Sequence, residues 1–224
     1  MDYEEVIARL KDQANPDNVA GMARYGINPT NTLGISIPAL RRLAREIKPD
    51  HPLALRLWDS GYHEARILAS FIAEPDKITE EQLEHWVNDF DSWDVVDQVS
   101  AFIYRTPFIP AKIHQWAGRD TEFVRRAAFS LIAEVAVHHK QMADADFEPL
   151  FGLIKEAASD ERNYVKKAVN WALRNIGKRN PALNRRAIEV AREIQQLDSK
   201  AARWIAADAL RELTGEKVQQ RLGG

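Results

Sequence analysis

The chain of 224 residues is 45% hydrophobic and 29% charged, as expected of a globular protein with a substantial core. It contains no cysteine, which excludes disulfides, thiol nucleophiles and thiolate metal sites. The formal net charge of −2 is unevenly distributed, because residues 1–160 carry 17 Lys and Arg against 26 Asp and Glu, whereas residues 161–224 carry 14 against 7. The basic last third is therefore a candidate surface for phosphate, with a dipolar surface that binds nothing as the alternative.

Apolar residues recur at helical spacing along almost the whole chain, for example over residues 2–13 and 122–136. Runs of alternating β-branched residues are absent. We predict an all-α protein of about a dozen helices that forms a single domain over residues 1–224. No apolar run is long enough to span a membrane, and residues 1–13 are charged throughout, unlike a signal peptide. We therefore expect no membrane span and a cytoplasmic protein. Helix breaks are expected just before Pro16, Pro29, Pro49, Pro75, Pro107 and Pro181.

Three similar segments begin at Asp120, Asp160 and Asp198, at nearly equal spacings of about 40 residues. Each Asp is suited to cap a helix, and basic and then alanine-rich positions follow it. Weaker copies begin at Ser60 and Ser92. A two-helix unit that recurs at this interval predicts HEAT-like repeats, stacked into a helical solenoid (an α-α superhelix) with a concave groove.

The second helix of each pair is expected to line that groove. Trp93 and Asp97 are four residues apart and Trp171 and Arg174 are three apart, so each pair shares a helix face. A carboxylate beside tryptophan faces can stabilise a developing cation, and nearby guanidinium groups can hold the phosphates of DNA.

Two further basic residues occupy corresponding positions in the repeats. Arg126 lies six residues after Asp120, and Lys166 lies six residues after Asp160. Both are therefore expected to point to equivalent places in the groove, where Lys167 adds a further positive charge to the basic last third.

Five motifs follow one another along the chain: MARYGIN (22–28), LGISIPALRRLARE (33–46), SWDVVD (92–97), VRRAAF (124–129) and KKAVNWALRNIGKRNP (166–181). No single motif is as specific as a P-loop, but their order and spacing together are fairly specific. With these motifs, the sequence resembles over most of its length the AlkD-like DNA alkylation-repair glycosylases, which are built from HEAT-like repeats.

The resemblance implies a role for five residues. Asp97 matches the catalytic carboxylate of the family, and Trp93 and Trp171 match two tryptophans that face the damaged nucleotide. Tyr25 matches an aromatic residue near the lesion, and Arg126 matches an arginine that contacts the DNA backbone. Ser92 departs from the pattern, since some relatives have a tryptophan there, and the acidic character of positions 1–160 is unusual for a DNA-binding arm.

The function implied is excision of cationic N3- or N7-alkylated purines from double-stranded DNA by a monomer that uses no metal or organic cofactor. Because such a base already carries positive charge, it departs without a general acid, and one carboxylate suffices to stabilise the sugar cation and orient water. Lys166, Lys167, Arg174 and Arg126 would hold phosphates, and binding would depend strongly on salt. The alternative is a non-catalytic HEAT-like scaffold that binds a protein or unusual DNA structures.

The remaining candidate residues have ordinary structural interpretations. Asp94 is expected to be a solvated helix residue or to support the first turn of its helix. His138 and His139 are adjacent, so they diverge on a helix and cannot share one metal. Packing roles are expected for Trp58, Trp86, Trp116 and Trp204.

Overall fold

The computed structural model describes residues 1–223, which form fourteen α helices, one short 3₁₀ helix and no strand. The predicted all-α class is confirmed. The helices pack into two compact units, Met1–Phe108 and residues 109–223.

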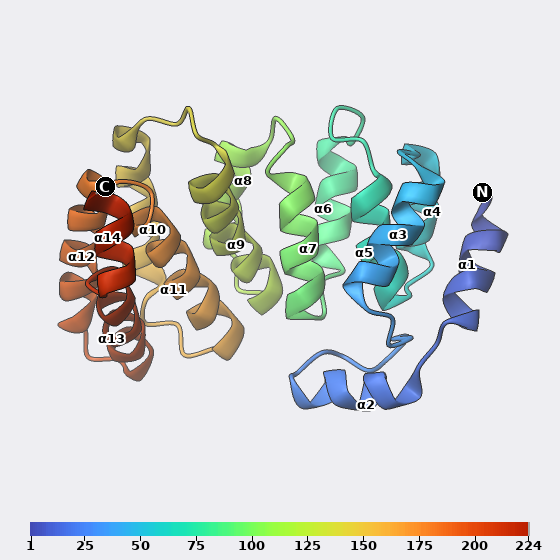
Figure 1. Ribbon diagram of the computed structural model, residues 1–224, viewed down its shortest axis with the longest axis horizontal. Helices are drawn as coiled ribbons and strands as arrows, with labels where there is room; N and C mark the ends of the chain where they lie inside the picture. Colours follow the sequence, from blue (N-terminus) through green and yellow to red (C-terminus); the bar gives the residue numbers. More distant parts are fainter. Residues whose placement is uncertain (224) are drawn as a thin grey trace. The chain divides into compact units, whose positions relative to one another are not determined.

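The helices are named in chain order (Figure 1). The first unit contains α1 (Tyr3–Asp12), α2 (Pro16–Arg24), α3 (Ile37–Ile47), α4 (His51–Asp59), α5 (His63–Ile72), α6 (Glu80–Asn88) and α7 (Trp93–Ile103). The second unit contains α8 (Ile109–Ala117), α9 (Glu122–His138), the 3₁₀ helix η1 (Asp144–Phe147), α10 (Glu148–Ala157), α11 (Asn163–Gly177), α12 (Pro181–Gln195), α13 (Lys200–Leu213) and α14 (Glu216–Gly223).

In the first unit, α5 is the central helix and packs against α3, α4 and α7. The indoles of Trp58 and Trp86 stack in the core with ring centroids 4.4 Å apart. Helix α2 differs from its neighbours, since it runs crosswise to them (Figure 1) and buries none of its residues. Polar contacts rather than hydrophobic burial must therefore hold α2 in place.

In the second unit, α9, α11 and α13 lie side by side, and α8, α10 and α12 pack against them in turn (Figure 1). Side-chain contacts between successive helix pairs recur between residues that are 38 positions apart in the sequence. The same separation lies between Asp160 and Asp198. The pairs at this offset are Glu148–Arg186, Lys155–Glu193, Glu161–Ser199, Lys166–Trp204, Asn170–Asp208 and Arg174–Glu212.

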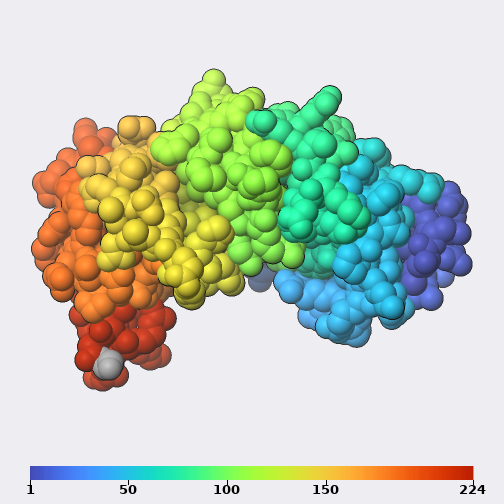
Figure 2. All heavy atoms as spheres, turned by 90° about the horizontal axis from the view of Figure 1, so that it is seen from above, coloured from blue at the N-terminus to red at the C-terminus, as the bar shows by residue number. Residues whose placement is uncertain are grey.

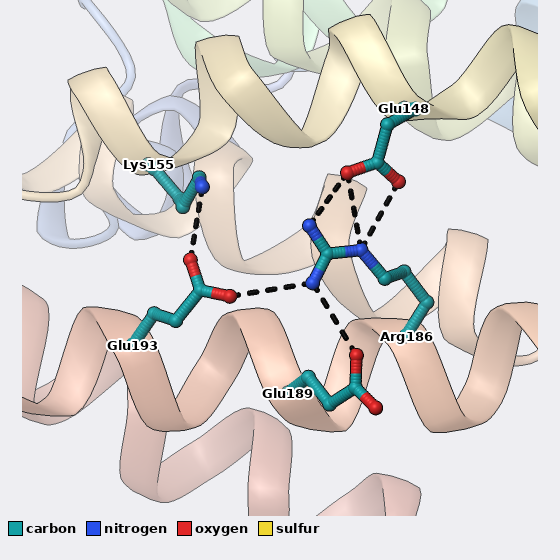
Figure 3. A network of polar contacts seen from close by, with 5 residues as sticks. All are labelled: Glu148, Lys155, Arg186, Glu189 and Glu193. Atoms are coloured by element: carbon teal, nitrogen blue, oxygen red, sulfur yellow. Dashed lines mark hydrogen bonds and ion pairs between the residues drawn. The ribbon is translucent and has the colours of Figure 1, made fainter.

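Arg186 shows how these contacts join one repeat to the next (Figure 3). Its guanidinium on α12 binds Glu148 of α10 through Nε at 3.0 Å and also bonds Glu189 and Glu193 of its own helix. Glu193 in turn accepts from Lys155 of α10 at 2.9 Å. These groups are half-exposed or exposed, so their main effect is to fix the register of α10 against α12 rather than to add much stability.

The predicted aspartate caps of the repeats are wrong. The N-caps of α9, α11 and α13 are Thr121, Arg162 and Ser199. Asp160 instead accepts from the backbone N–H and guanidinium of Arg162.

Carboxylates of the preceding repeat reach the helix starts instead. Glu122 accepts from the N–H of Tyr164 at 3.1 Å. Glu161 likewise accepts from the N–H of Ala201 at 3.1 Å. Capping between repeats cannot be found by looking only at the residues beside each helix.

The weaker repeat copies begin differently. Ser60 is the C-cap of α4, whereas Ser92 is the N-cap of α7 but makes no side-chain capping bond.

Three of the four tryptophans expected to be packing residues are confirmed in that role. Trp58, Trp86 and Trp116 are 0–1% exposed. The expectation for Trp204 is wrong, because its side chain on α13 is 41% exposed. The ring lies beside Lys166 of α11, while α13 and α14 (red) stand next to α12 (orange) in Figure 2.

Candidate functional site

Two of the predicted site residues, Trp93 and Asp97, lie at the start of α7, and a third, Tyr25, contacts Trp93. Trp93 is the first residue of the helix and Asp97 lies one turn further along it, and both are half-buried. The indole Nε1 of Trp93 donates to the backbone carbonyl of Tyr25 at 3.1 Å. Tyr25 is the C-cap of α2, and its ring is exposed, with 77% of its surface accessible. The first unit thus brings Tyr25, Trp93 and Asp97 to one place.

Further hydrogen bonds fix the segment after α2 to the start of α7. The backbone N–H of Asn28 donates to the Ser92 hydroxyl at 2.9 Å, and its side-chain amide donates to Asp91 at 2.8 Å. Ser92 is fully buried. A tryptophan at position 92 would lose this hydroxyl acceptor, so serine suits the local packing of this chain.

Asp94, in the first turn of α7, is not solvated, so the first of the two expectations for it is wrong, whereas the second, support of the first turn of its helix, agrees with the contact it makes. Its Oδ2 lies 2.9 Å from Nε2 of His63, the first residue of α5. The two side chains are 14% and 3% exposed. The next residue along α5, Glu64, is also fully buried and accepts three backbone N–H bonds from residues 33–35. These buried groups hold α7 and the residues before α3 against α5.

The His63–Asp94 pair predicts a pH-dependent stability. Burial lowers the pKa of His63, but the hydrogen bond and charge of Asp94, with the charges of Glu64 and Asp91, outweigh it, so the pKa lies above the ordinary 6.5. A raised pKa means that this pair stabilises fully below about pH 6.5, and the contribution is lost as pH rises through the folded-state pKa.

Asp94→Asn is therefore expected to lower the free energy of unfolding by about 1.5–3 kcal/mol below pH 6.5, and by less at about pH 8. Urea denaturation at both pH values measures this. An equal loss at both pH values would show that His63 carries no charge in the folded protein.

In the second unit, Arg126 of α9 is buried, with 6% of its surface accessible. One guanidinium nitrogen donates to the carbonyl of Tyr164, near the start of α11, at 2.7 Å. Its neighbour Arg125 is half-buried and lies 3.3 Å from Asp160. Both arginines thus join α9 to the start of the next repeat, and the DNA contact expected of Arg126 stays a prediction.

Arg174 also lies between repeats. On α11, it pairs with Asp208, at 3.3 Å, and with Glu212, both of α13. Lys178, one turn further along, pairs with Glu212 at 2.8 Å. The positive charges near the end of α11 are therefore largely neutralised by carboxylates of α13.

The charges at the beginning of α11 are arranged differently. Lys166 places its ammonium 5.1 Å from the ring centroid of Trp204 on α13. Lys167 is exposed, and Trp171, one turn later on the same face, is half-exposed. Among the predicted basic residues, Lys166 and Lys167 are thus less closely paired with carboxylates than Arg174, although the carboxylate of Glu161 lies near enough to interact with Lys166.

Sequence reasoning missed the contacts of two residues here. His63 could not be paired with Asp94 because the two are 31 residues apart and lie on different helices. The contact of Trp204 with Lys166 could have been predicted, because the two residues are 38 positions apart, like many other contacting pairs in the second unit.

Within residues 1–223, no three His, Asp or Glu side chains are grouped closely enough to hold a metal ion. No helix of the described part of the chain is long and apolar enough to cross a membrane.

Known proteins resemble the chain along most of its length. Residues 6–213 match the family model described as DNA alkylation repair enzyme. The uncharacterized protein Lmo0209 of Listeria monocytogenes is 22% identical over 197 residues, and the uncharacterized protein Lin0241 of Listeria innocua is 21% identical over 197 residues. Each alignment covers 86% of this chain and 86% of the relative.

A solved structure supports the same assignment of fold. It is described as belonging to a new family of proteins related to the HEAT-like repeat DNA glycosylases with affinity for branched DNA structures. It shares 18% of its residues with this chain at a TM-score of 0.81, and the alignment covers 100% of this chain and 97% of that one. The predicted HEAT-like repeat architecture is confirmed. Since the family match spans residues 6–213, the chain belongs to the DNA alkylation repair enzyme family.

Proposed function

We propose that this protein is a DNA glycosylase that hydrolyses the N-glycosidic bond of cationic N3- or N7-alkylated purines in double-stranded DNA. The observation that carries the proposal is the arrangement at the start of α7, where Asp97 lies one turn from Trp93 and Trp93 is hydrogen-bonded to the backbone of Tyr25. The membership of the chain in the DNA alkylation repair enzyme family supports it.

The proposed hydrolysis requires little more than the carboxylate and the aromatic rings of this arrangement. As an alkylated purine departs with its positive charge, the sugar becomes an oxocarbenium-like cation. The half-buried carboxylate of Asp97 would stabilise that cation and orient the water that attacks it. The indole face of Trp93 and the exposed ring of Tyr25 would attract the cationic base, each by about 0.5–2 kcal/mol.

Rigidity of α7 matters for this role. A catalytic carboxylate acts best when its own position needs no rearrangement during the reaction. The His63–Asp94 pair and the bond between Asn28 and Ser92 hold the first turn of α7, directly before Asp97. These residues are positioning residues in the proposed reaction.

The second unit would contribute affinity for DNA. Lys166 and Lys167 are the most available of the predicted phosphate contacts, and Trp171 is a proposed contact to the damaged nucleotide. Arg174 and Arg126 bind a carboxylate and a carbonyl of the protein, so a phosphate would have to compete with those partners.

The direct test is release of free 7-methylguanine and 3-methyladenine from methylated duplex DNA, compared with heat-denatured protein and with no protein. Release above the spontaneous rate is expected. Folded protein that releases neither base would contradict the proposal.

That negative result would favour a second function, binding to DNA structures without catalysis. One observation favours this alternative: the solved structure with a TM-score of 0.81 is described as having affinity for branched DNA structures. Binding that survives Asp97→Asn without any base release would identify the protein as such a binder.

A further inference from the structure

The exposed ring of Trp204 has surroundings that set it apart from an ordinary surface residue. A single exposed apolar side chain is common and indicates nothing by itself. Within residues 109–223, however, Trp204 is the one aromatic side chain that is exposed, and the ammonium of Lys166 lies 5.1 Å from its ring centroid. The ring thus contacts a neighbouring repeat while much of its surface stays in water.

The charges around this ring are not neutralised in the way that those further along α11 are. Arg174 pairs with two carboxylates of α13. Lys166, two turns earlier on α11, instead contacts the indole of Trp204 on α13. Glu161 is close enough for the charge of Lys166 to act on it, and its carboxylate also accepts from Ser199. The carboxylate offsets part of the positive charge of Lys166, whose ammonium lies against the indole.

One more lysine lies beside the ring. Lys200 begins α13 one turn before Trp204, so the two share a helix face, and Lys200 is exposed. Lys166 and Lys200 therefore place two positive charges beside one exposed indole, with the carboxylate of Glu161 nearby.

We propose that Trp204, with Lys166 and Lys200, forms a binding site for unpaired DNA. An aromatic ring beside positive charges binds single strands by stacking on a base while the lysines contact the phosphates. The bases of an intact duplex are stacked on one another and offer no face to such a ring, so an unpaired nucleotide is the DNA element that fits. The inference rests on the DNA-binding part of the proposed function but does not require catalysis.

The test is fluorescence polarisation with two labelled probes of the same sequence, a single-stranded oligonucleotide and a blunt duplex. Trp204→Ala is expected to weaken single-strand binding about tenfold, and Trp204→Phe, which keeps an aromatic ring, to weaken it much less. Duplex binding should change less than about twofold in both variants. Equal losses on the two probes, or no loss on either, would overturn the proposal.

Lysine variants test the electrostatic part. Lys200→Ala should weaken single-strand binding and reduce its salt dependence by about one phosphate contact. The matched control is Lys217→Ala, since Lys217 is an exposed lysine on α14 away from this ring. An equal effect of the two lysine variants would show attraction by net charge alone and contradict a defined site.

The result is independent of base excision. A protein that releases no base, yet loses single-strand binding on Trp204→Ala, would contradict the proposed enzyme and support this site. Because Trp204 is exposed, its variants should melt at the temperature of the wild type, which circular dichroism can verify.

Discussion

Asp97→Asn is expected to lower the rate of base release at least about 100-fold without a matching loss of DNA affinity. Asparagine has nearly the same shape as aspartate but no charge, so it removes the electrostatic stabilisation of the sugar cation and leaves only a neutral, weaker acceptor for the attacking water. Losing one positioned group that stabilises transition-state charge typically costs about 100- to 1000-fold in rate. Single-turnover release of 7-methylguanine from methylated duplex DNA measures the effect.

Two controls make that result specific. Asp76→Asn changes an exposed aspartate between α5 and α6 and should leave the rate unchanged. Affinity of Asp97→Asn for undamaged duplex should stay within about twofold of the wild type or improve slightly, because a negative charge near phosphates is removed. A variant that keeps the wild-type rate would remove Asp97 from the mechanism, even if the protein releases bases.

The helices and their repetition could be predicted from the sequence because they depend on local periodicity. Trp93 and Asp97 do lie on one helix, and Trp58, Trp86 and Trp116 do fill the core. These predictions needed only the spacing of residues within a helix and the apolar character of the indole.

The partners of polar side chains could not be predicted in the same way. Asp94 was expected to be solvated or to support the first turn of its own helix, but its partner His63, on another helix, was not foreseen. Arg126 was expected at a surface, but the start of the next repeat covers it. Each of these outcomes depends on which residue of another helix lies opposite, and local spacing does not contain that information.

The exposure of Trp204 was likewise not predicted from the sequence. A tryptophan within an alanine-rich helix is usually buried, and the expectation followed that rule. It was wrong because the side of α13 that carries Trp204 faces Lys166 of α11 and solvent rather than the core. The alanine-rich composition of a helix does not tell which of its positions lie against the core.

The second large effect is expected from Glu64→Gln, which should lower the free energy of unfolding by about 2–4 kcal/mol. The carboxylate is fully buried, and its oxygens accept from the N–H groups of Leu33 at 2.8 Å and Gly34 at 2.6 Å. Glutamine would replace one acceptor oxygen by an NH₂ donor that faces these donors. At least one buried N–H would then lose its partner, which is the costly outcome for a polar group away from water.

The loss should be concentrated around α2. That helix buries no residue, and it is attached through bonds from Asn18 to the carbonyl of Gly34 and from the N–H of Asn15 to that of Leu33. Gly34 has a φ of +79°, and a Cβ there would overlap the Asn15 carbonyl, so no other residue fits this place easily. The segment that Glu64 holds is thus the one that positions α2 and, at its end, Tyr25.

Urea denaturation measures the stability, and hydrogen exchange of the amides at residues 33–35 locates the change. Glu81→Gln, an exposed glutamate on α6, is the matched control and should change stability by no more than about 0.5 kcal/mol. Because α2 carries Tyr25, Glu64→Gln should also slow base release while Asp97 remains in place. Unchanged exchange at residues 33–35 would show that α2 is held independently of Glu64, and the link between this buried carboxylate and the position of Tyr25 would fail.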